Sequence, residues 1–354
     1  MKRAKTRKIH IANIAIGGDA PITVQSMTNT DTRDIKSTVS QIHRLEEAGC
    51  DIVRCTVPDK EAAEALARII PQIHIPLVAD IHFDYRLALA SIEAGVAKLR
   101  INPGNIGKKE NVKAVVEAAE DKGVPIRIGV NSGSLSRDIL QKYGGVCPEA
   151  LVESAMRHVE ILEELNFKDI LISVKSSDVQ EMIESYRLIS QKVDYPLHIG
   201  VTESGTVKKG TIKSSVGIGA LLSEGIGDTI RVSLTGDPVE EVFVGKEILK
   251  SLGNIKEGVE LISCPTCGRT QLDLIKIAQD VEQRLSSVKK HIKVAVMGCA
   301  VNGPGEDRRA DIGLAGGNGE GLIFREGKII RKVKEEDMVD ELIKEIKKII
   351  GENN

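Results

Sequence analysis

Short runs rich in β-branched residues recur along the first two thirds of the chain, and the segments between them have apolar positions at a helical period. "DIKSTVSQIHRLEEAGC" and "EAAEALARIIPQI" are two of these helical segments. Strands that alternate with helices in this way are typical of βα units and a parallel sheet. We predict eight strands, in segments 22–27, 51–57, 76–82, 97–104, 125–131, 169–177, 196–203 and 229–235.

Eight βα units in about 250 residues predict a TIM (β/α)8 barrel, here over residues 1–253. An open doubly wound sheet is the alternative that fits the same pattern.

The pattern changes after residue 253. A strand leads into "ISCPTCGRT", and a helix over 271–285, a strand over 293–298 and the loop "CAVNGPGEDRRA" follow. A glycine-rich pair of strands and a helix over 335–350 close the chain. This order predicts a second, smaller α+β domain over residues 254–354.

Composition excludes several classes of protein. The 354 residues include 49 Lys and Arg against 51 Asp and Glu, so the net charge is -2 and no excess of basic charge favours nucleic acid or a membrane surface. Aromatic residues are only 2% of the chain and Trp is absent, which removes stacking platforms for bases. The basic start is not followed by an apolar run, and no later stretch is long and apolar enough to span a bilayer. With six cysteines and no secretory signal, we expect a cytoplasmic protein whose thiols are reduced.

Charged and polar residues gather where the predicted strands end. In a TIM barrel these ends surround the active site. Four arginines and a lysine at one mouth would repel one another unless an anion held them, which favours a multiply charged substrate such as a diphosphate. Salt bridges at the rim are the alternative. The residues are Arg54, Asp80, His82, Arg100, Asn102, Arg127, Asn131, Lys175, His198, Glu203, Arg231 and Ser233.

Three members of this set can exchange protons near neutral pH: Asp80, His82 and Glu203. Glu203 follows "GVT" just past a strand, where surrounding cations would keep it ionised. A purely electrostatic role, pairing with the arginines, is equally consistent with its position. His198 lies earlier in its strand, and we expect it to pack inside the barrel.

Three cysteines fall in the second domain. Cys264 and Cys267 are three residues apart, and Cys299 opens the loop after the strand at 293–298. A zinc ribbon needs a second pair, although His291 offers a fourth ligand for a zinc site of three cysteines and one histidine. Three thiolates with one ligand of another kind also suit an iron–sulfur cluster, and the spacing alone leaves both open.

Several long stretches together resemble the 4-hydroxy-3-methylbut-2-enyl diphosphate synthase family. They are "IGGDAPITVQSMTNTDT", "VADIHFD", "LRINPGN", "IRIGVNSGSL", "VKSSD", "GVTESG", "RVSLTGDP", "SCPTCGRT" and "MGCAVNGPGE", in this order from near residue 10 to near residue 320. The chain is similar to the short, two-domain bacterial form, which lacks the middle insertion of plant relatives.

The resemblance implies a TIM barrel, a C-terminal domain with one [4Fe–4S] cluster, and four cluster ligands that fall on Cys264, Cys267, Cys299 and Glu306. It implies that Arg54, Arg100, Arg127, Lys175 and Arg231 bind the diphosphate with help from Asn102, Asn131 and Ser233. Asp80, His82 and Glu203 match polar active-site positions of the family, with Glu203 in proton transfer.

The reaction so implied is the two-electron reductive ring opening and dehydration of 2-C-methyl-D-erythritol 2,4-cyclodiphosphate, in the methylerythritol phosphate route to isoprenoids. Reduced flavodoxin or ferredoxin would supply the electrons singly. We also expect a head-to-tail homodimer in which each C-terminal domain covers the barrel of its partner. A zinc-stabilised phosphate-binding protein without catalysis, and a different reductase built on a barrel, are the competing hypotheses.

Overall fold

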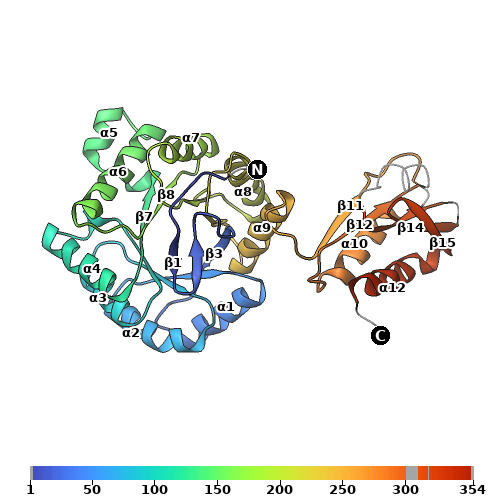
Figure 1. The fold of residues 1–354 in the computed structure, drawn as a ribbon, viewed down its shortest axis with the longest axis horizontal. Coiled ribbons are helices and arrows are strands. Elements are labelled where there is room, and N and C mark those ends of the chain that lie inside the picture. The colour runs from blue at the N-terminus through green and yellow to red at the C-terminus, as the bar shows by residue number, and fades with distance from the viewer. Residues whose placement is uncertain (1–2, 271, 300–309, 318, 352–354) are drawn as a thin grey trace. The chain divides into compact units, whose positions relative to one another are not determined.

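The computed structural model describes residues 3–270, 272–299, 310–317 and 319–351 (Figure 1). The chain forms two compact units, Met1–Asn254 and Ile255–Asn354. Among the helices of the described ranges, none combines the length and the apolar character that crossing a bilayer demands.

The first unit is a barrel of eight parallel strands with helices around it (Figure 1). The strands pair in the order β8-β7-β6-β5-β4-β3-β10-β9, and a parallel bridge between Ile172 and Leu197 joins the two ends of that order. All eight strands lie in the segments predicted from the sequence. They are β3 Thr23–Met27, β4 Ile52–Thr56, β5 Leu77–Asp80, β6 Lys98–Ile101, β7 Ile126–Asn131, β8 Ile170–Lys175, β9 His198–Ile199 and β10 Thr229–Ile230.

Five barrel helices, α1, α2, α3, α7 and α9, begin directly after an aspartate. Side chains of Asp34, Asp59 and Asp178 each accept a hydrogen bond from a backbone N–H in the first turn of the next helix, which supplies one of the partners that a helix start lacks. The helices are α1 Ile35–Glu47, α2 Lys60–Ile69, α3 Tyr85–Glu93, α4 Lys109–Lys122, α5 Arg137–Tyr143, α6 Pro148–Glu164, α7 Val179–Ser190, α8 Val207–Ser223 and α9 Pro238–Ser251. Short 3-10 turns occupy Ile70–Gln72, Pro103–Asn105 and Ser132–Ser134.

A hairpin that the sequence analysis did not predict precedes the barrel. It consists of β1, Ile9–Ile11, and β2, Ile14–Ile16, paired antiparallel. Its isoleucines form one apolar cluster with Ile52, Val78 and Leu171, which lie near the starts of three different barrel strands. These three side chains meet only if they point into the barrel, so the hairpin closes the end of the barrel at which the strands begin.

In its described residues, the second unit is a five-stranded mixed sheet with the helices α10 and α12. β11 Val259–Ser263, β12 Ile292–Met297 and β13 Ile312–Gly316 are parallel, and β14 Glu320–Arg325 and β15 Lys328–Lys334 continue the sheet antiparallel. α10 Leu274–Leu285 and α12 Met338–Ile350 share one core with the sheet, and a 3-10 turn at Glu335–Asp337 precedes α12. The sequence predicted two strands between the loop and the last helix, whereas the structure has three.

Candidate active site

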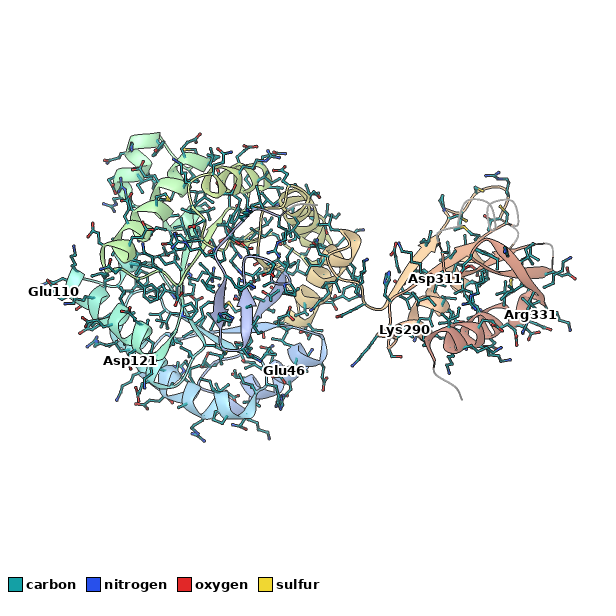
Figure 2. The ribbon with its side chains drawn as sticks, in the orientation of Figure 1. Glu46, Glu110, Asp121, Lys290, Asp311 and Arg331 are labelled. Carbon is teal, nitrogen blue, oxygen red and sulfur yellow. The ribbon has the colours of Figure 1, made fainter. Side chains whose placement is uncertain are left out.

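The inside of the barrel is built in layers, and strand register decides which residues share one. Successive side chains of a strand point to opposite faces, so Arg54, Asp80 and Lys175 share the inward face of Ile52, Val78 and Leu171. Side chains fill the space inside the strands (Figure 2). In a TIM barrel, alternate strands contribute to each layer. Counted from the hairpin upward, the register gives five layers. The first layer holds Ile52, Lys98, Leu171 and Thr229, and the second holds Gln25, Val78, Arg127 and His198. The third holds Arg54, Arg100, Ser173 and Arg231, the fourth holds Met27, Asp80, Gly129 and Gly200, and the fifth, at the mouth, holds Thr56, Asn102, Lys175 and Ser233.

Three arginines therefore share the third layer, and a buried carboxylate lies directly above two of them. Asp80 Oδ1 accepts a hydrogen bond from Arg100 at 3.1 Å, and Asp80 Oδ2 lies 3.5 Å from Arg54 Nε. Both guanidinium groups are nearly inaccessible to solvent. Burial by itself raises the pKa of Asp80, but Arg54 and Arg100 outweigh it, so the pKa is lowered and the carboxylate stays ionised.

The third arginine is held from outside the strands. Arg231 donates to Oε1 of Glu241 on α9 at 3.2 Å, and Glu241 is buried. The same carboxylate accepts hydrogen bonds from Ser26 Oγ and from the backbone N–H of Leu234. Glu241 positions Arg231, and the sequence analysis missed it because nothing in a helical segment marks one glutamate among several as facing the barrel.

Glycines replace side chains in the layer above the arginines. A Cβ atom at Gly129 would lie 2.3 Å from Arg100 Nε, and one at Gly200 would lie 3.1 Å from Lys175 Nζ. Each glycine thus leaves room for a cation from a neighbouring layer. The signal was present in the sequence, because "RIGV" and "HIGV" each carry a lone glycine inside a strand, a pattern typical of a close approach.

The lower layers hold two more buried cations. Arg127 lies one layer below the other arginines and donates to Ser173 Oγ at 2.7 Å, while its Nε and one terminal nitrogen have no hydrogen-bond partner. Lys98, which the sequence analysis missed, donates to Gln25 Oε1 at 3.1 Å and is fully buried. Lys98 precedes Arg100 by two residues in β6, so both side chains point to the same face of the strand. The alternation of side chains along a strand could therefore have predicted Lys98 from the sequence. His198 is buried here, and neither ring nitrogen has a hydrogen-bond partner.

Cations outnumber carboxylates in this interior. Of the described residues, two carboxylates, Asp80 and Glu241, form ion pairs with its basic side chains. The pKa of Arg54 falls to about 10, because burial and the neighbouring Arg231 and Arg100 disfavour its charged form more than Asp80 favours it. Burial and nearby arginines also place the pKa values of Arg127, Lys175 and Lys98 well below their ordinary values. An anion with several charges would relieve this repulsion. The six basic residues are Arg54, Lys98, Arg100, Arg127, Lys175 and Arg231.

The remaining predicted residues lie at the mouth, in loops or, for Asn131, at the end of β7. Asn102 bonds the backbone of Gly129 through both its amide oxygen and its amide nitrogen. Asn131 and Ser233 are partly exposed, and His82 and Glu203 are exposed. Glu203 has φ +51°, a left-handed backbone that glutamate rarely adopts and that functional sites often hold under strain.

The cysteines of the second unit lie where two parallel strands end. Cys264 follows β11, and Cys299 lies two residues beyond β12. Cys264 Sγ accepts a hydrogen bond from the backbone N–H of Gly298 at 3.3 Å. Cys267 is exposed, and hydrogen bonds from the backbone and side chain of Arg269 lower its pKa, which favours the thiolate. Glu306, the fourth predicted ligand, lies outside the described residues.

Among the residues with described positions, the sulfurs of Cys264, Cys267 and Cys299 are not all within 4.8 Å of one another. Thiolates on a single zinc ion lie within about 4 Å of one another, because sulfur binds zinc at about 2.3 Å.

Comparison with known proteins matches both units. Residues 6–246 match the family described as the GcpE TIM-barrel domain, and residues 260–348 match the GcpE protein C-terminal domain. A Clostridium perfringens protein named 4-hydroxy-3-methylbut-2-en-1-yl diphosphate synthase (flavodoxin) is 69% identical over 99% of this chain and 100% of its own length. A Geobacter sulfurreducens protein of the same name is 60% identical over 99% of this chain and 100% of its own length.

Solved structures share the barrel at much lower identity. Dihydropteroate synthase from Stenotrophomonas maltophilia aligns with a TM-score of 0.51 at 14% identity, over 70% of this chain and 98% of that chain. A likeness at this identity shows the fold alone.

Proposed function

This chain belongs to the GcpE family, and we propose that the cation-rich interior of its barrel holds the cyclic diphosphate that it reduces. The protein is an iron–sulfur oxidoreductase that converts 2-C-methyl-D-erythritol 2,4-cyclodiphosphate to 4-hydroxy-3-methylbut-2-enyl diphosphate by reductive ring opening and dehydration. This is a step of the methylerythritol phosphate route to isoprenoids. One observation supports the binding site above all: six buried or partly buried basic side chains converge on the barrel interior against two carboxylates.

The layers suggest how the residues divide the work. Arg54, Arg100 and Arg231 share one layer and would contact the diphosphate oxygens, since guanidinium groups bind phosphate in pairs of hydrogen bonds. Lys175, Asn102 and Ser233 lie above them at the mouth and would close the site around the substrate. Asp80 and Glu241 hold the arginine side chains in place before the substrate arrives, which reduces the entropy lost on binding. Arg127 adds positive charge from below, and Asn131 lies at the rim.

Proton transfer falls to the exposed acid–base groups of the mouth. The dehydration needs a proton for the departing oxygen, and Glu203 lies in the loop after β9 with a positive φ. His82 lies two residues beyond Asp80, the last residue of β5, and its side chain is exposed. Glu203 would take part in this proton transfer, and His82 with Asp80 would orient the substrate hydroxyl groups.

One [4Fe–4S] cluster is the cofactor in this proposal. Cys264, Cys267 and Cys299 would hold three irons and Glu306 the fourth. The lowered pKa of Cys267 and the backbone hydrogen bond to Cys264 Sγ both favour bound thiolates. When bound, the cluster would pass on the two electrons of the reaction one at a time, and the donor would be reduced flavodoxin, as the relatives' name indicates, or ferredoxin. All six cysteines are free, which suits the cytoplasm as the expected compartment.

A head-to-tail homodimer would bring cluster and substrate together. Near its start α9 contacts Arg231 through Glu241, and farther along Lys246 lies 3.3 Å from Asp51, just before β4. The helix therefore ends at the closed face of the barrel, away from the arginines, and the first unit ends shortly after it, at Asn254. Covering the mouth of a partner's barrel avoids a return path over the chain's own barrel.

The reaction itself can be assayed directly. Anaerobically purified protein with its cluster should convert the cyclodiphosphate to the allylic diphosphate when reduced flavodoxin is supplied, with two electrons consumed for each product. A protein that binds the cyclodiphosphate but forms no product under these conditions would support the phosphate-binding alternative instead.

A further inference from the structure

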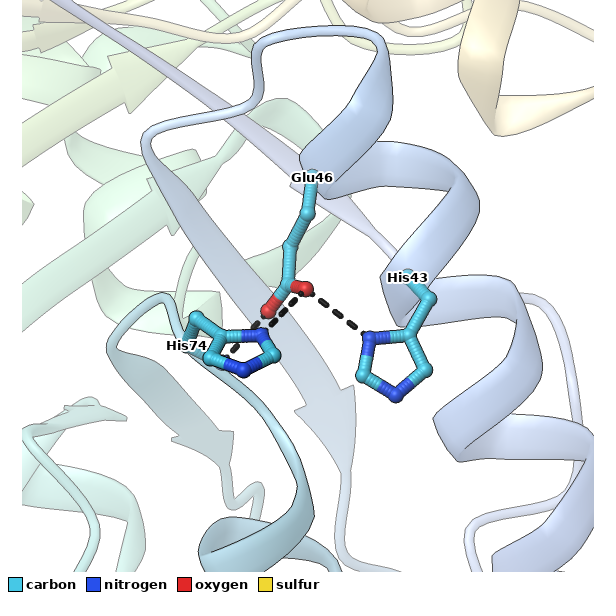
Figure 3. A group of neighbouring side chains, drawn as sticks. All are labelled: His43, Glu46 and His74. Carbon is cyan, nitrogen blue, oxygen red and sulfur yellow. Dashed lines mark hydrogen bonds and ion pairs between the residues drawn. The ribbon is translucent and has the colours of Figure 1, made fainter.

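Two histidines and a glutamate converge on the outside of the barrel, near the closed face (Figure 3). His43 and Glu46 lie in the last turns of α1, and His74 lies in the link between the 3-10 turn after α2 and β5. Glu46 Oε2 lies 2.9 Å from His43 Nδ1 and 3.0 Å from His74 Nδ1. Both imidazole rings thus turn the same ring nitrogen toward the same carboxylate oxygen. The end of α1 and the start of β5 belong to the face opposite the arginines, so the group is separate from the substrate site.

The carboxylate is fixed before any ion arrives. Its other oxygen, Oε1, accepts hydrogen bonds from the backbone N–H groups of His74 at 2.6 Å and Ile75 at 3.2 Å. Burial alone would raise the pKa of Glu46, but the hydrogen bonds from His74, His43 and Ile75 lower it to about 2. The carboxylate is therefore negatively charged, and Oε2 faces both rings in one fixed direction. Hydrogen bonds from neighbouring groups orient the ligands of known metal sites in the same way.

The donor set and its spacing select a type of ion. Two imidazole nitrogens and one carboxylate oxygen suit zinc and similar divalent transition metals, and sites with three protein ligands leave a fourth position for water. In a tetrahedral site with bonds of about 2.0 Å, neighbouring ligand atoms are about 3.3 Å apart. The nitrogen–oxygen distances of 2.9 and 3.0 Å are close to this spacing, and a small rotation of each ring opens them far enough.

We infer that His43, Glu46 and His74 form a binding site for one zinc ion, with a water as the fourth ligand. The ion would replace the two N–H protons that the imidazole rings now share with Glu46. It would tie the end of α1 to the link before β5. His43 also lines a surface groove between α1 and α2, so the water position is open to solvent. The inference is independent of the reaction proposed for the barrel interior.

The test uses cluster-containing protein titrated with zinc chloride against a chromophoric chelator. We expect one zinc ion per chain at this site, with the visible absorption of the cluster unchanged. Zinc K-edge absorption should report nitrogen and oxygen neighbours at about 2.0 Å, not sulfur at about 2.3 Å. His74→Ala and His43→Ala should each weaken binding at least about tenfold. His74 is largely exposed, so its replacement should leave the unfolding temperature in the absence of zinc unchanged.

His10→Ala is the matched control, because His10 is an exposed histidine of the hairpin outside the group. It should bind zinc as tightly as the unaltered protein. Three results would overturn the inference: no zinc bound, equal binding by the His74→Ala and unaltered proteins, or a zinc ion with sulfur neighbours. The first would mean that the three side chains form a hydrogen-bonded group only.

Discussion

A Cβ atom on Gly129 would lie 2.3 Å from Nε of Arg100, a distance that real Cβ atoms essentially never show. Arg100 fills this space because its guanidinium group donates to the carbonyl of Gly129 at 2.7 Å and to Asp80 at 3.1 Å. Because Gly129 of β7 has no side chain, the Arg100 side chain of β6 can occupy this space and reach Asp80.

Gly129→Ala should push the Arg100 guanidinium away from Asp80 and from its place in the arginine layer. Hydrogen bonds to charged groups contribute about 1.5–3 kcal/mol, so we expect KM for the cyclodiphosphate to rise roughly tenfold or more. Iron content and the far-ultraviolet circular dichroism should stay the same. Gly219→Ala on α8 is the control, since nothing lies within 4 Å of a Cβ atom there. Equal KM values for the two variants would contradict the positioning role of Gly129.

Asp80→Asn should destabilise the barrel at neutral pH by about 3 kcal/mol, the scale for breaking a buried ion pair. The arginines lower the pKa of Asp80 below its value in the unfolded chain, ordinarily about 3.9. The stability that its ionised form contributes is therefore present above that unfolded pKa and is lost as pH falls through the folded pKa. Urea unfolding followed by tyrosine fluorescence should show the difference between the two proteins shrinking below about pH 4. A difference that grows on acidification would show that Asp80 is not the stabilising charge.

Glu203→Gln should keep substrate binding and lower turnover by roughly a hundredfold, the usual scale for a lost proton-transfer group. Gln retains the size of the side chain, and the exposed position makes a folding defect unexpected. Single-turnover kinetics with the pre-reduced protein measure the effect directly. Unchanged turnover would remove Glu203 from the proton path.

The unaltered, anaerobically purified protein should absorb visible light and contain about four irons per chain. Cys264→Ser should abolish this absorption, because the cluster loses one of its ligands. Cys147→Ser is the control, because Cys147 lies in the barrel before α6 and outside the cysteine group of the second unit. Iron analysis and the absorption spectrum are the measurements. Zinc bound by sulfur, without visible absorption in the unaltered protein, would instead favour a zinc site of three cysteines and one histidine.

Mixed dimers test the shared active site. Glu203→Gln chains and Cys264→Ser chains should each be inactive, whereas their mixture should regain roughly a quarter of the full activity. This follows because half of the dimers are mixed after random exchange, and each mixed dimer has one site with an intact barrel and an intact partner cluster. Subunit exchange is verified with two differently tagged chains. Proven exchange without recovery would show that barrel and cluster of the same chain work together.

The sequence determined the number of barrel strands and most of the chemistry at their ends. Eight β-branched runs separated by amphipathic helices correspond to β3 through β10, because local periodicity reflects which face of each element is buried. Lys175 ends β8 at the mouth, where a strand end is expected to face the active site. Arg54 and Arg100 lie inside their strands, two layers below the mouth. The hairpin Ile9–Ile16 was missed, since two strands of three residues carry too short a pattern to predict.

Only the closed barrel decided which of these residues meet. The strand register places Arg54, Arg100 and Arg231 in one layer and Arg127 in the layer below. The sequence predicts these four arginines as one group and does not separate them into layers. His43 and His74 are 31 residues apart in sequence, and α1 and the link before β5 bring them to one carboxylate. Glu241 reaches Arg231 from a helix outside the strands. Such contacts depend on strand stagger and helix packing over long sequence separations, and local periodicity carries no information about either.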